Sequence, residues 1–349
     1  MLGSTDSTGN QEGMAKRKIT DQQQRRIRRK HSSSIDSAGN RQRGEKLLKS
    51  GELGPEQNGL VVTRYSNQVD VVTSPTSAPE RCYLRSNLES VVTGDNIIWR
   101  PGQPYGVVCA VQPRKTLLDR PDSRGKLRPV AANIDLIVVV IAPEPRPHAN
   151  LIDRYLVAIE HRGIKPLLLF NKTDLASDNT QLTKKFAHTY AALGYDVIEA
   201  SAESNQGIEQ LTGVLQQHTS VFVGQSGVGK SSLINAICPA AEAAIGSLSE
   251  AHAKGRHTTT TANLFFLPGG GQLIDSPGIR EFGLIHLDED DIAQGFIELR
   301  PFLGHCKFRD CRHQNDPGCA LQNALEAGKI SPQRMQSYQL IKLSLANEQ

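Results

Sequence analysis

The clearest chemistry in the chain lies at residues 224–231, which read Gly-Gln-Ser-Gly-Val-Gly-Lys-Ser and complete the pattern Gly-x-x-x-x-Gly-Lys-Ser. Glycines let the backbone bend so that successive N–H groups point at phosphate oxygens. We expect Lys230 to reach the β and γ phosphates of a nucleotide, and Ser231 to ligate Mg²⁺. A merely flexible glycine turn is the alternative. The residues predicted to hold the phosphates are Gly224, Gln225, Ser226, Gly227, Val228, Gly229, Lys230, Ser231 and Ser232.

A second motif, Asn-Lys-Thr-Asp at residues 171–174, precedes this phosphate loop in the chain. The Asp174 carboxylate can accept hydrogen bonds from guanine N1 and from the exocyclic amine N2, which adenine lacks. Asn171 is expected to tie this loop to the phosphate loop, and the stem of Lys172 to cover one face of the base. Thr173 completes the motif. The tetrapeptide therefore indicates GTP rather than ATP as the ligand.

Two shorter segments complete the predicted pocket. The backbone amides of Ser201 and Ala202, in an Ala-Ser-Ala sequence, are expected to donate to guanine O6. Asp275 opens an Asp-Ser-Pro-Gly sequence and is the candidate for indirect Mg²⁺ coordination, while the N–H of Gly278 is the candidate for the γ phosphate. By itself Asp-Ser-Pro-Gly is an ordinary turn sequence. Its position at the end of an apolar run favours the nucleotide interpretation.

Apolar runs place each of these motifs at the end of an expected β-strand. The runs cover residues 165–170, 196–199, 220–223 and 271–275. A helix is expected to begin at Ser231, so that strand, glycine-rich turn and helix follow one another, as a phosphate loop requires. Ligands of open α/β sheets bind at the carboxyl ends of the strands. The sequence therefore predicts one nucleotide pocket at one edge of a sheet.

The order of the motifs is unusual, because the base-reading loops come first, the phosphate loop next and the Asp275 segment last. Together they resemble the GTPase fold with its chain order rotated. A pocket requires only that its loops meet at one sheet edge, so joining the old termini and opening the chain elsewhere preserves it. The helix-like stretch 208–218 is expected to make the new join. We therefore predict an α/β phosphate-loop GTPase domain that is circularly permuted.

From about residue 58 the chain is similar to the RsgA family of bacterial GTPases that depend on the small ribosomal subunit. In that family a small β-barrel precedes the permuted GTPase and a zinc-binding module follows it. The resemblance implies a multidomain protein with a disordered basic tail at 1–57, an OB-fold barrel at 58–116, the permuted GTPase domain at 117–285 and a zinc-binding helical domain at 286–349. It also implies GTP hydrolysis on the small subunit late in its maturation, with ribosome-stimulated turnover and release on hydrolysis.

A possible metal site lies near the carboxyl terminus, at Cys306, Cys311, His313 and Cys319. Three thiolates and one imidazole satisfy a closed tetrahedral structural Zn²⁺ site and leave no position for water. A short segment with little apolar material is expected to fold on such a metal. Disulfide pairing is the alternative. The same segment carries three cations that can contact phosphate: Lys307, Arg309 and Arg312.

Five short β-rich runs near the amino-terminal end suit an OB-type barrel. They cover residues 60–63, 69–72, 81–84, 96–99 and 106–111. OB barrels often bind single-stranded RNA through basic and aromatic surface residues. The candidates for that role are Arg64, Tyr65, Arg85 and Arg100. For each candidate a solvated surface role is the alternative, and Trp99 is expected in the barrel core.

The resemblance to GTPases also identifies a first switch segment at residues 255–261, Gly-Arg-His-Thr-Thr-Thr-Thr. It implies that Thr259 binds Mg²⁺ through its hydroxyl and the γ phosphate through its N–H, and that His257 positions water. A surface histidine is the alternative. Ras-like enzymes place a glutamine directly after Asp-x-x-Gly, but here that residue is Ile279, which cannot hydrogen-bond water. We therefore expect slow intrinsic hydrolysis, with His257, Lys230 and Thr259 as the catalytic residues.

Composition agrees with several soluble modules. The 349 residues can hold two or three domains, and 38% hydrophobic content is enough for cores. Residues 16–30 contain eight lysines and arginines against the single acid Asp21, which suits a tail that binds RNA phosphates; a solubilising tail is the alternative. No apolar run approaches a membrane span, and the amino terminus lacks the apolar core of a signal peptide. We expect a cytoplasmic monomer, with Cys82, Cys109 and Cys238 as buried thiols.

Two other functions remain open at this stage. The chain can be an RNA-binding module that uses GTP mainly as a structural ligand, although Lys230, Ser231 and Asp275 argue against this. It can also be a GTPase that acts on transfer RNA or on a membrane partner, although no amphipathic basic helix supports the membrane version. The favoured partners are the small ribosomal subunit with its rRNA, and GTP and GDP.

Overall fold

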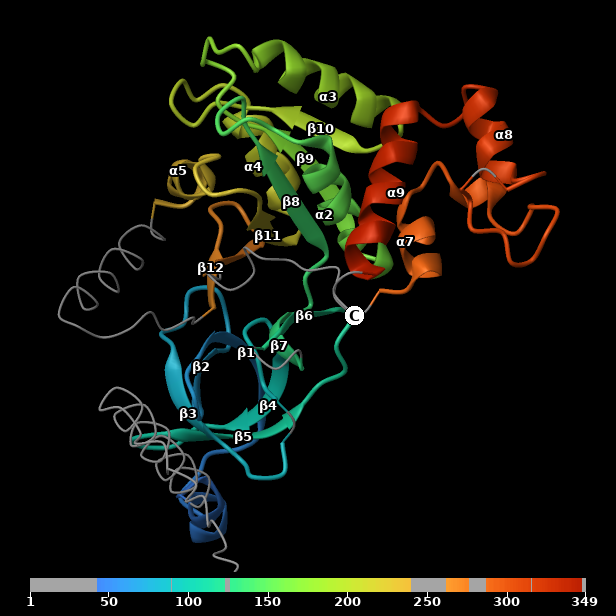
Figure 1. Ribbon diagram of the computed structural model, residues 1–349. Helices are drawn as coiled ribbons and strands as arrows, with labels where there is room; N and C mark the ends of the chain where they lie inside the picture. The colour runs from blue at the N-terminus through green and yellow to red at the C-terminus, as the bar shows by residue number, and fades with distance from the viewer. Residues whose placement is uncertain are drawn as a thin grey trace, which may run out of the picture.

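The computed structural model describes residues 43–88, 90–122, 126–239, 262–275, 287–314 and 316–346. Within these ranges a β-barrel lies below an α/β body, and a group of helices lies beside that body (Figure 1). The predicted switch segment 255–261, with His257 and Thr259, lies outside the described ranges, as do Gly278 and Ile279. The basic stretch 16–30 lies outside them as well.

The barrel has five strands in the order β1-β2-β3-β5-β4, and pairing of β1 with β4 closes it. The strands are β1 (Gln57–Arg64), β2 (Gln68–Val72), β3 (Glu80–Leu84), β4 (Asn96–Arg100) and β5 (Gly106–Val111). β3 and β5 run parallel, whereas the other neighbours are antiparallel. Trp99 is fully buried among barrel valines. The expected five-stranded barrel is confirmed, with the Trp99 ring at its centre.

The α/β body contains a sheet in the order β10-β9-β8-β11-β13-β12. Its strands are β8 (Leu136–Ile141), β9 (Lys165–Phe170), β10 (Asp196–Glu199), β11 (Thr219–Val223), β12 (Asn263–Phe266) and β13 (Gln272–Asp275). All neighbours are parallel except β12, which runs antiparallel to β13. β11, which leads into the phosphate loop, is central although it comes fourth in the chain. The rotated strand order confirms the permutation.

Helices cover both faces of this sheet, which explains why all six residues of β8 are buried. α2 (Ala149–His161) and α3 (Thr180–Ala192) pack on one face, where Ile152 and Phe186 meet Ile137. α4 (Ile208–Leu215) and α5 (Lys230–Ile237) pack on the other, where Leu211 and Leu233 meet Val138. The sheet edge that carries the motifs is thus held between two cores.

The barrel and the sheet of the body are continuous, because β1 pairs with β12 at Thr63 and Asn263. The Thr63 hydroxyl donates to Asn263 Oδ1 over 3.1 Å. The buried Thr93 hydroxyl donates to the Ala262 carbonyl over 2.9 Å, and Thr93 also bridges to Ala131. Ala131 belongs to a hairpin of β6 (Leu117–Pro121) and β7 (Leu127–Ala132). The barrel therefore holds the point at which β12 begins.

The carboxyl-terminal region packs against α2 of the body. It contains α7 (Glu289–Gly295), η1 (Arg300–Phe302), α8 (Ala320–Glu326) and α9 (Pro332–Ala346). Phe296, Ile341 and Tyr338 share a core with Val157 of α2. α9 lies in the region 286–349, where helices are expected, and its buried face joins this core. The zinc segment, which is residues 306–319 with the four predicted zinc ligands, packs against this core through Cys306, Cys311 and Cys319.

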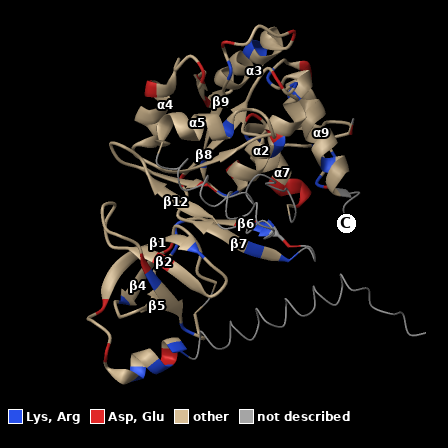
Figure 2. Ribbon diagram, turned by 90° about the vertical axis from the view of Figure 1, so that its left-hand side faces the viewer, with Lys and Arg blue, Asp and Glu red and all other residues tan. Residues whose placement is uncertain are grey.

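Charge is distributed unevenly over these parts. Acidic residues occupy the first turn of α7, and lysine and arginine lie on the β6–β7 hairpin (Figure 2). Among the described residues, no helix combines the length and apolar character needed to cross a membrane. On the β6–β7 hairpin Arg128 pairs with Asp122 over 3.1 Å, so part of its positive charge is neutralised within the hairpin.

Candidate nucleotide site and metal cluster

The loops after β9 and β11 meet at the carboxyl edge of the sheet, on either side of β8. Asn171 directly follows β9 and is only 1% exposed. Its backbone N–H donates to the Ile141 carbonyl over 2.7 Å, and its side-chain Nδ2 donates to the Val228 carbonyl over 2.9 Å. Val228 lies in the phosphate loop. Asn171 thus ties two motifs that are far apart in the chain into one structure.

The Asp174 carboxylate is held by the loop after β10. Ser201, which is fully buried, donates its hydroxyl hydrogen bond to Asp174 Oδ1 and accepts one at 3.0 Å from the N–H of Ser204. The Thr173 N–H donates to the Ala200 carbonyl over 3.2 Å. One carboxylate oxygen is therefore oriented by the protein. Asp174 can present its other oxygen to the edge of a base.

Lys172 lies across the phosphate loop. Its backbone is left-handed, with φ at 61°, and its ammonium donates to the Gly227 carbonyl over 2.7 Å and to the Glu144 carbonyl over 3.1 Å. The ammonium is thereby anchored, so the methylene stem is available as an apolar surface. A planar base can lie against this stem, as the sequence predicts.

The phosphate loop depends on glycine at two close approaches. A Cβ at Gly224 would lie 2.4 Å from the Val140 carbonyl oxygen, and one at Gly229 would lie 2.4 Å from Asn171 Nδ2. Both glycines also have positive φ, at 139° and 93°. These contacts keep the loop tight against β8 and against the base-reading loop. Neither position can accept a larger residue without displacing them.

The turn after Gly229 starts α5, so Lys230, Ser231 and Ser232 form the first turn of a helix. Helix N-termini carry partial positive charge and unpaired N–H groups, which suit an anion. Lys230 Nζ donates to the carbonyls of Gly224 and Gln225, over 2.7 and 2.5 Å. The ammonium therefore curls over the loop and lies beside the position where phosphates would sit.

Asp275 is the last residue of β13, the strand beside β11. The parallel register pairs Val221 with Ile274, so Asp275 emerges at the same sheet edge as the phosphate loop. Five of the predicted segments or residues therefore converge: 171–174, 201–202, 224–229, 230–232 and Asp275. His257, Thr259 and Gly278 lie outside the described residues, and the structure does not place them.

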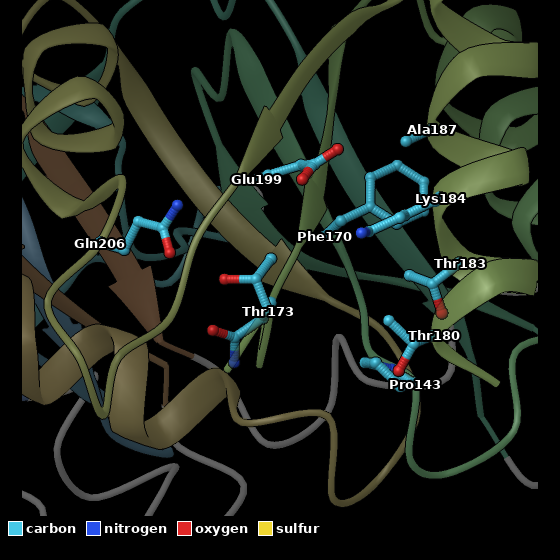
Figure 3. A pocket seen from close by; sticks show the side chains of 10 residues that line it. Pro143, Phe170, Thr173, Thr180, Thr183, Lys184, Ala187, Glu199 and Gln206 are labelled. Atoms are coloured by element: carbon cyan, nitrogen blue, oxygen red, sulfur yellow. The ribbon is translucent and has the colours of Figure 1, made fainter. Parts of the chain in front are cut away.

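A cavity of about 180 Å³ lies behind the base-reading loop (Figure 3). Asn171 and Thr173 line it together with Thr180 and Thr183 of α3, whereas Lys172 and Asp174 do not. Alternate residues of the tetrapeptide therefore face opposite ways. This cavity opens to solvent beside the exposed residues Lys184, Glu199 and Gln206, and neither Lys172 nor Asp174 faces it.

The four predicted zinc ligands lie close together. The ligand atoms of Cys306, Cys311, His313 and Cys319 lie within 4.8 Å of one another. His313 Nδ1 lies 3.5, 3.5 and 3.4 Å from the three sulfurs. A tetrahedral ion with Zn–S of about 2.3 Å and Zn–N of about 2.0 Å implies N···S distances of about 3.5 Å. The donor set and its spacing therefore fit Zn²⁺, and these thiols do not form disulfides in the structure.

Surrounding groups support this cluster. The Ala320 N–H points at Cys306 Sγ over 3.3 Å, and the Asp316 carboxylate accepts from the N–H groups of Arg312 and Gln314, each over 3.1 Å. These bonds, with that from Gln314 first, lower the pKa of Asp316. Burial, followed by the charge of Lys342, lowers the pKa of His313, which favours the neutral imidazole that binds metals.

The barrel candidates have mixed placements. The guanidinium of Arg100 donates to the carbonyls of Leu53 and Gly54, so it stabilises the barrel itself. Tyr65 stacks under Arg81, whose guanidinium carbon lies 3.9 Å from the ring centroid, and donates to Asp70. The guanidinium of Arg100 is therefore occupied by backbone carbonyls, which is neither the RNA-binding role nor the solvated role expected for it. Tyr65 belongs to a polar cluster with Asp70 and Arg81.

Comparison with known proteins identifies the family. The sequence model of the RsgA GTPase family matches residues 111–285. A protein of Pseudomonas aeruginosa named small ribosomal subunit biogenesis GTPase RsgA is 53% identical over 335 residues, which cover 95% of this chain and 98% of that protein. The chain belongs to the RsgA GTPase family. It is therefore a GTP-hydrolysing enzyme. A protein of the same name from Azotobacter vinelandii is also 53% identical, with the same coverage.

Two solved structures agree with the fold. YjeQ from Thermotoga maritima aligns with a TM-score of 0.69 and 30% identity, over 84% of this chain and 99% of its own. YloQ, described as a circularly permuted GTPase, aligns with a TM-score of 0.67 and 26% identity, over 84% of this chain and 96% of its own. The rotated strand order of this RsgA-family chain is thus shared with solved relatives.

Two contacts in the site were not predicted from sequence. The Glu144 carbonyl, in the loop after β8, holds Lys172, and the Ser201 hydroxyl holds Asp174. A backbone carbonyl has no residue signature, so the first contact carried no signal. The second could have been found, because a serine that follows the strand beside an aspartate-bearing loop can supply a hydroxyl as well as an amide.

Proposed function

We propose that this chain binds GTP with Mg²⁺ at the edge formed by the loops after β9, β10, β11 and β13, and that it hydrolyses GTP during small ribosomal subunit biogenesis. The observation that carries the proposal is the hydrogen bond from Asn171 to Val228. It joins the base-reading loop to the phosphate loop in a chain where the two are permuted. The names of the 53% identical relatives supply the biological context.

Each residue has a role that follows from its place. Asp174 reads the amine edge of guanine, and Lys172 covers its face. Lys230 and the N–H groups of the loop neutralise the phosphates. Ser231 and Thr259 would hold Mg²⁺, which supplies positive charge to the β and γ oxygens, and Asp275 would support it. His257 positions the attacking water because Ile279 cannot.

The partner is proposed to complete the site. Ile279 offers no hydrogen bond to water, so the chain alone turns over slowly. Docking on the small subunit places Thr259 and His257 at the nucleotide, and release follows hydrolysis. The barrel, the hairpin cations and the zinc segment, whose Cys306, Cys311, His313 and Cys319 would hold one structural Zn²⁺, provide the surfaces that meet rRNA. The chain acts as a monomer in the cytoplasm.

Hydrolysis of GTP and of ATP, measured with and without purified small subunits, tests the proposal. We expect slow GTP turnover, strong stimulation by small subunits and little ATP turnover. Stimulation by transfer RNA instead of small subunits would identify a different target. Rates that stay near zero under all conditions would mean that GTP is only a structural ligand and would overturn the proposal.

A further inference from the structure

An exposed aromatic side chain projects from the zinc segment. Phe308 lies between the ligands Cys306 and Cys311 and is 47% exposed. It is the one aromatic among the large apolar side chains that are exposed in the described ranges. The neighbouring Lys307 ammonium lies 5.4 Å from the centroid of its ring. A flat apolar ring beside a cation, on a loop between two predicted zinc ligands, is suited to stacking against a planar group.

Phe308 also lines a cavity of about 540 Å³ between the zinc segment and α7. This volume falls within the roughly 300–1,000 Å³ of sites that take small molecules. Leu303 and Phe308 supply apolar walls, Arg309 supplies a cation, and Gln294 and Asp290 of α7 supply polar groups. The cluster of metal ligands forms another wall. The lining is thus more polar than apolar, with Phe308 and Leu303 as the large apolar side chains, which suits a ligand that has one flat face and polar edges.

The acidic residues at the start of α7 have different partners, and Asp290 is the one that lines the cavity. Asp288 and Asp291 form the capping box of the helix, and Glu289 pairs with Lys342. Asp290 lines the cavity, where its carboxylate can accept from an exocyclic amine. Gln294, one turn further along α7, offers both a donor and an acceptor. These are the groups needed to read a base edge.

The geometry points to a pocket for one unpaired nucleotide of single-stranded RNA, with its base stacked on Phe308, its edge against Asp290 and Gln294, and its phosphate on Arg309. This inference rests on the proposed function for its partner class. It adds a site at which the C-terminal region takes a base out of a strand. A base inside a duplex cannot enter, because its faces are already stacked.

Binding of the zinc-loaded full chain to a labelled single-stranded RNA of mixed sequence, measured by fluorescence anisotropy, tests the pocket. The same RNA annealed to its complement is the second probe. Phe308→Ala is expected to weaken single-strand binding about tenfold and to leave duplex binding unchanged. Phe308→Tyr keeps the ring and should bind like the wild type. Leu340→Ala removes another exposed side chain of the same region, 48% exposed, and should have no effect.

Salt dependence separates stacking from charge. Phe308→Ala should lower affinity by the same factor at each salt concentration, whereas Arg309→Gln should reduce the slope of log affinity against log salt by about 0.7. Zinc content and basal GTP turnover of every variant should match the wild type, which shows that the fold is intact. A single-strand affinity of Phe308→Ala equal to that of the wild type would overturn the pocket.

Two further outcomes are decisive. If Phe308→Ala weakens binding to small subunits but leaves RNA binding intact, the cavity takes a protein segment and the RNA assignment is wrong. If small subunits fail to stimulate the wild type while single-strand binding still depends on Phe308, the pocket stands and the proposed ribosomal function fails. The two proposals can therefore be told apart.

Discussion

At the scale of single residues, Asp174 is the side chain that is expected to select guanine over other bases. Ser201 donates to Asp174 Oδ1, so an asparagine at this position would keep its oxygen toward Ser201 and turn its NH₂ toward the base. Asp174→Asn should therefore bind GTP about 10- to 100-fold more weakly, since a hydrogen bond to a charged group contributes about 1.5–3 kcal/mol. It should gain affinity for xanthosine triphosphate, which carries a carbonyl where guanine has its amine. Calorimetric titration of both nucleotides measures the exchange.

A matched control is Asp196→Asn. Asp196 also lies at the surface of the sheet, where it pairs with Lys165 over 2.8 Å, and both side chains are more than half exposed. Its substitution should leave both affinities unchanged. If Asp174→Asn retains full preference for GTP, the base is read by another group.

The sequence could predict those site residues whose side-chain type is required by the chemistry. Lys230, Asp174 and the four metal-type ligands are recognisable because few other side chains can do their work. The partners that hold them are less visible. Lys172 is anchored by the carbonyls of Glu144 and Gly227, which any residue at those positions would supply. Such contacts follow only from the fold.

At the scale of elements, the start of β12 is held by the barrel. The fully buried Thr93 hydroxyl donates to the Ala262 carbonyl, a few residues after the predicted Mg²⁺ ligand Thr259. Thr93→Val removes this donor at nearly constant volume, and leaving a buried acceptor unpaired costs about 1–3 kcal/mol. We expect the kcat of small-subunit-stimulated hydrolysis to fall about tenfold, because Ala262, three positions after Thr259, loses its hydrogen bond to the barrel. GTP affinity, measured by titration, should change less than about twofold, because Thr93 does not belong to the nucleotide site.

Two further variants sharpen this test. Thr93→Ser restores the hydroxyl and should recover most of the turnover. Thr189→Val removes a hydroxyl that bonds to the Lys185 carbonyl within α3, far from β12, and should leave turnover unchanged. Equal losses in Thr93→Val and Thr189→Val would point to general destabilisation instead of positioning.

Strands that carry motifs were predicted well, and pairings between distant elements were not. The apolar runs at 165–170 and 196–199 coincide with β9 and β10, because buried parallel strands are apolar throughout. The pairing of β1 with β12, by contrast, joins residues that lie 200 positions apart. Thr63 and Asn263 carry no pattern that selects each other. The link from the barrel to β12 therefore required the structure.

At the scale of the whole molecule, one buried ionic network joins the C-terminal helices to the GTPase body. Arg334 of α9 is 1% exposed and pairs with Asp153 of α2 and with Glu298, whose Oε1 lies 2.5 Å from its Nε. Its guanidinium carbon lies 4.4 Å from the centroid of the Phe296 ring and 5.6 Å from that of Tyr190 in α3. Three helices and a connecting segment thus meet at a single cation, so we expect the zinc segment and the GTPase body to unfold together.

Arg334→Met should destabilise the protein strongly, because it leaves Asp153 and Glu298 without their cation in a buried site. Removing one partner of a buried pair typically costs about 3–5 kcal/mol. Arg300→Met is the control, since Arg300 pairs with Glu160 at the surface, where its side chain is 42% exposed, and such pairs contribute about 0–1 kcal/mol. Urea unfolding, followed through hydrogen exchange of the buried strand β8 in the GTPase body and through zinc release, gives both free energies. Similar losses of unfolding free energy for the two arginine variants would show that Arg334 does not join the modules. A large loss for Arg334→Met alone, with both signals shifting together, would show that this cation holds the GTPase body and the zinc segment as one unit.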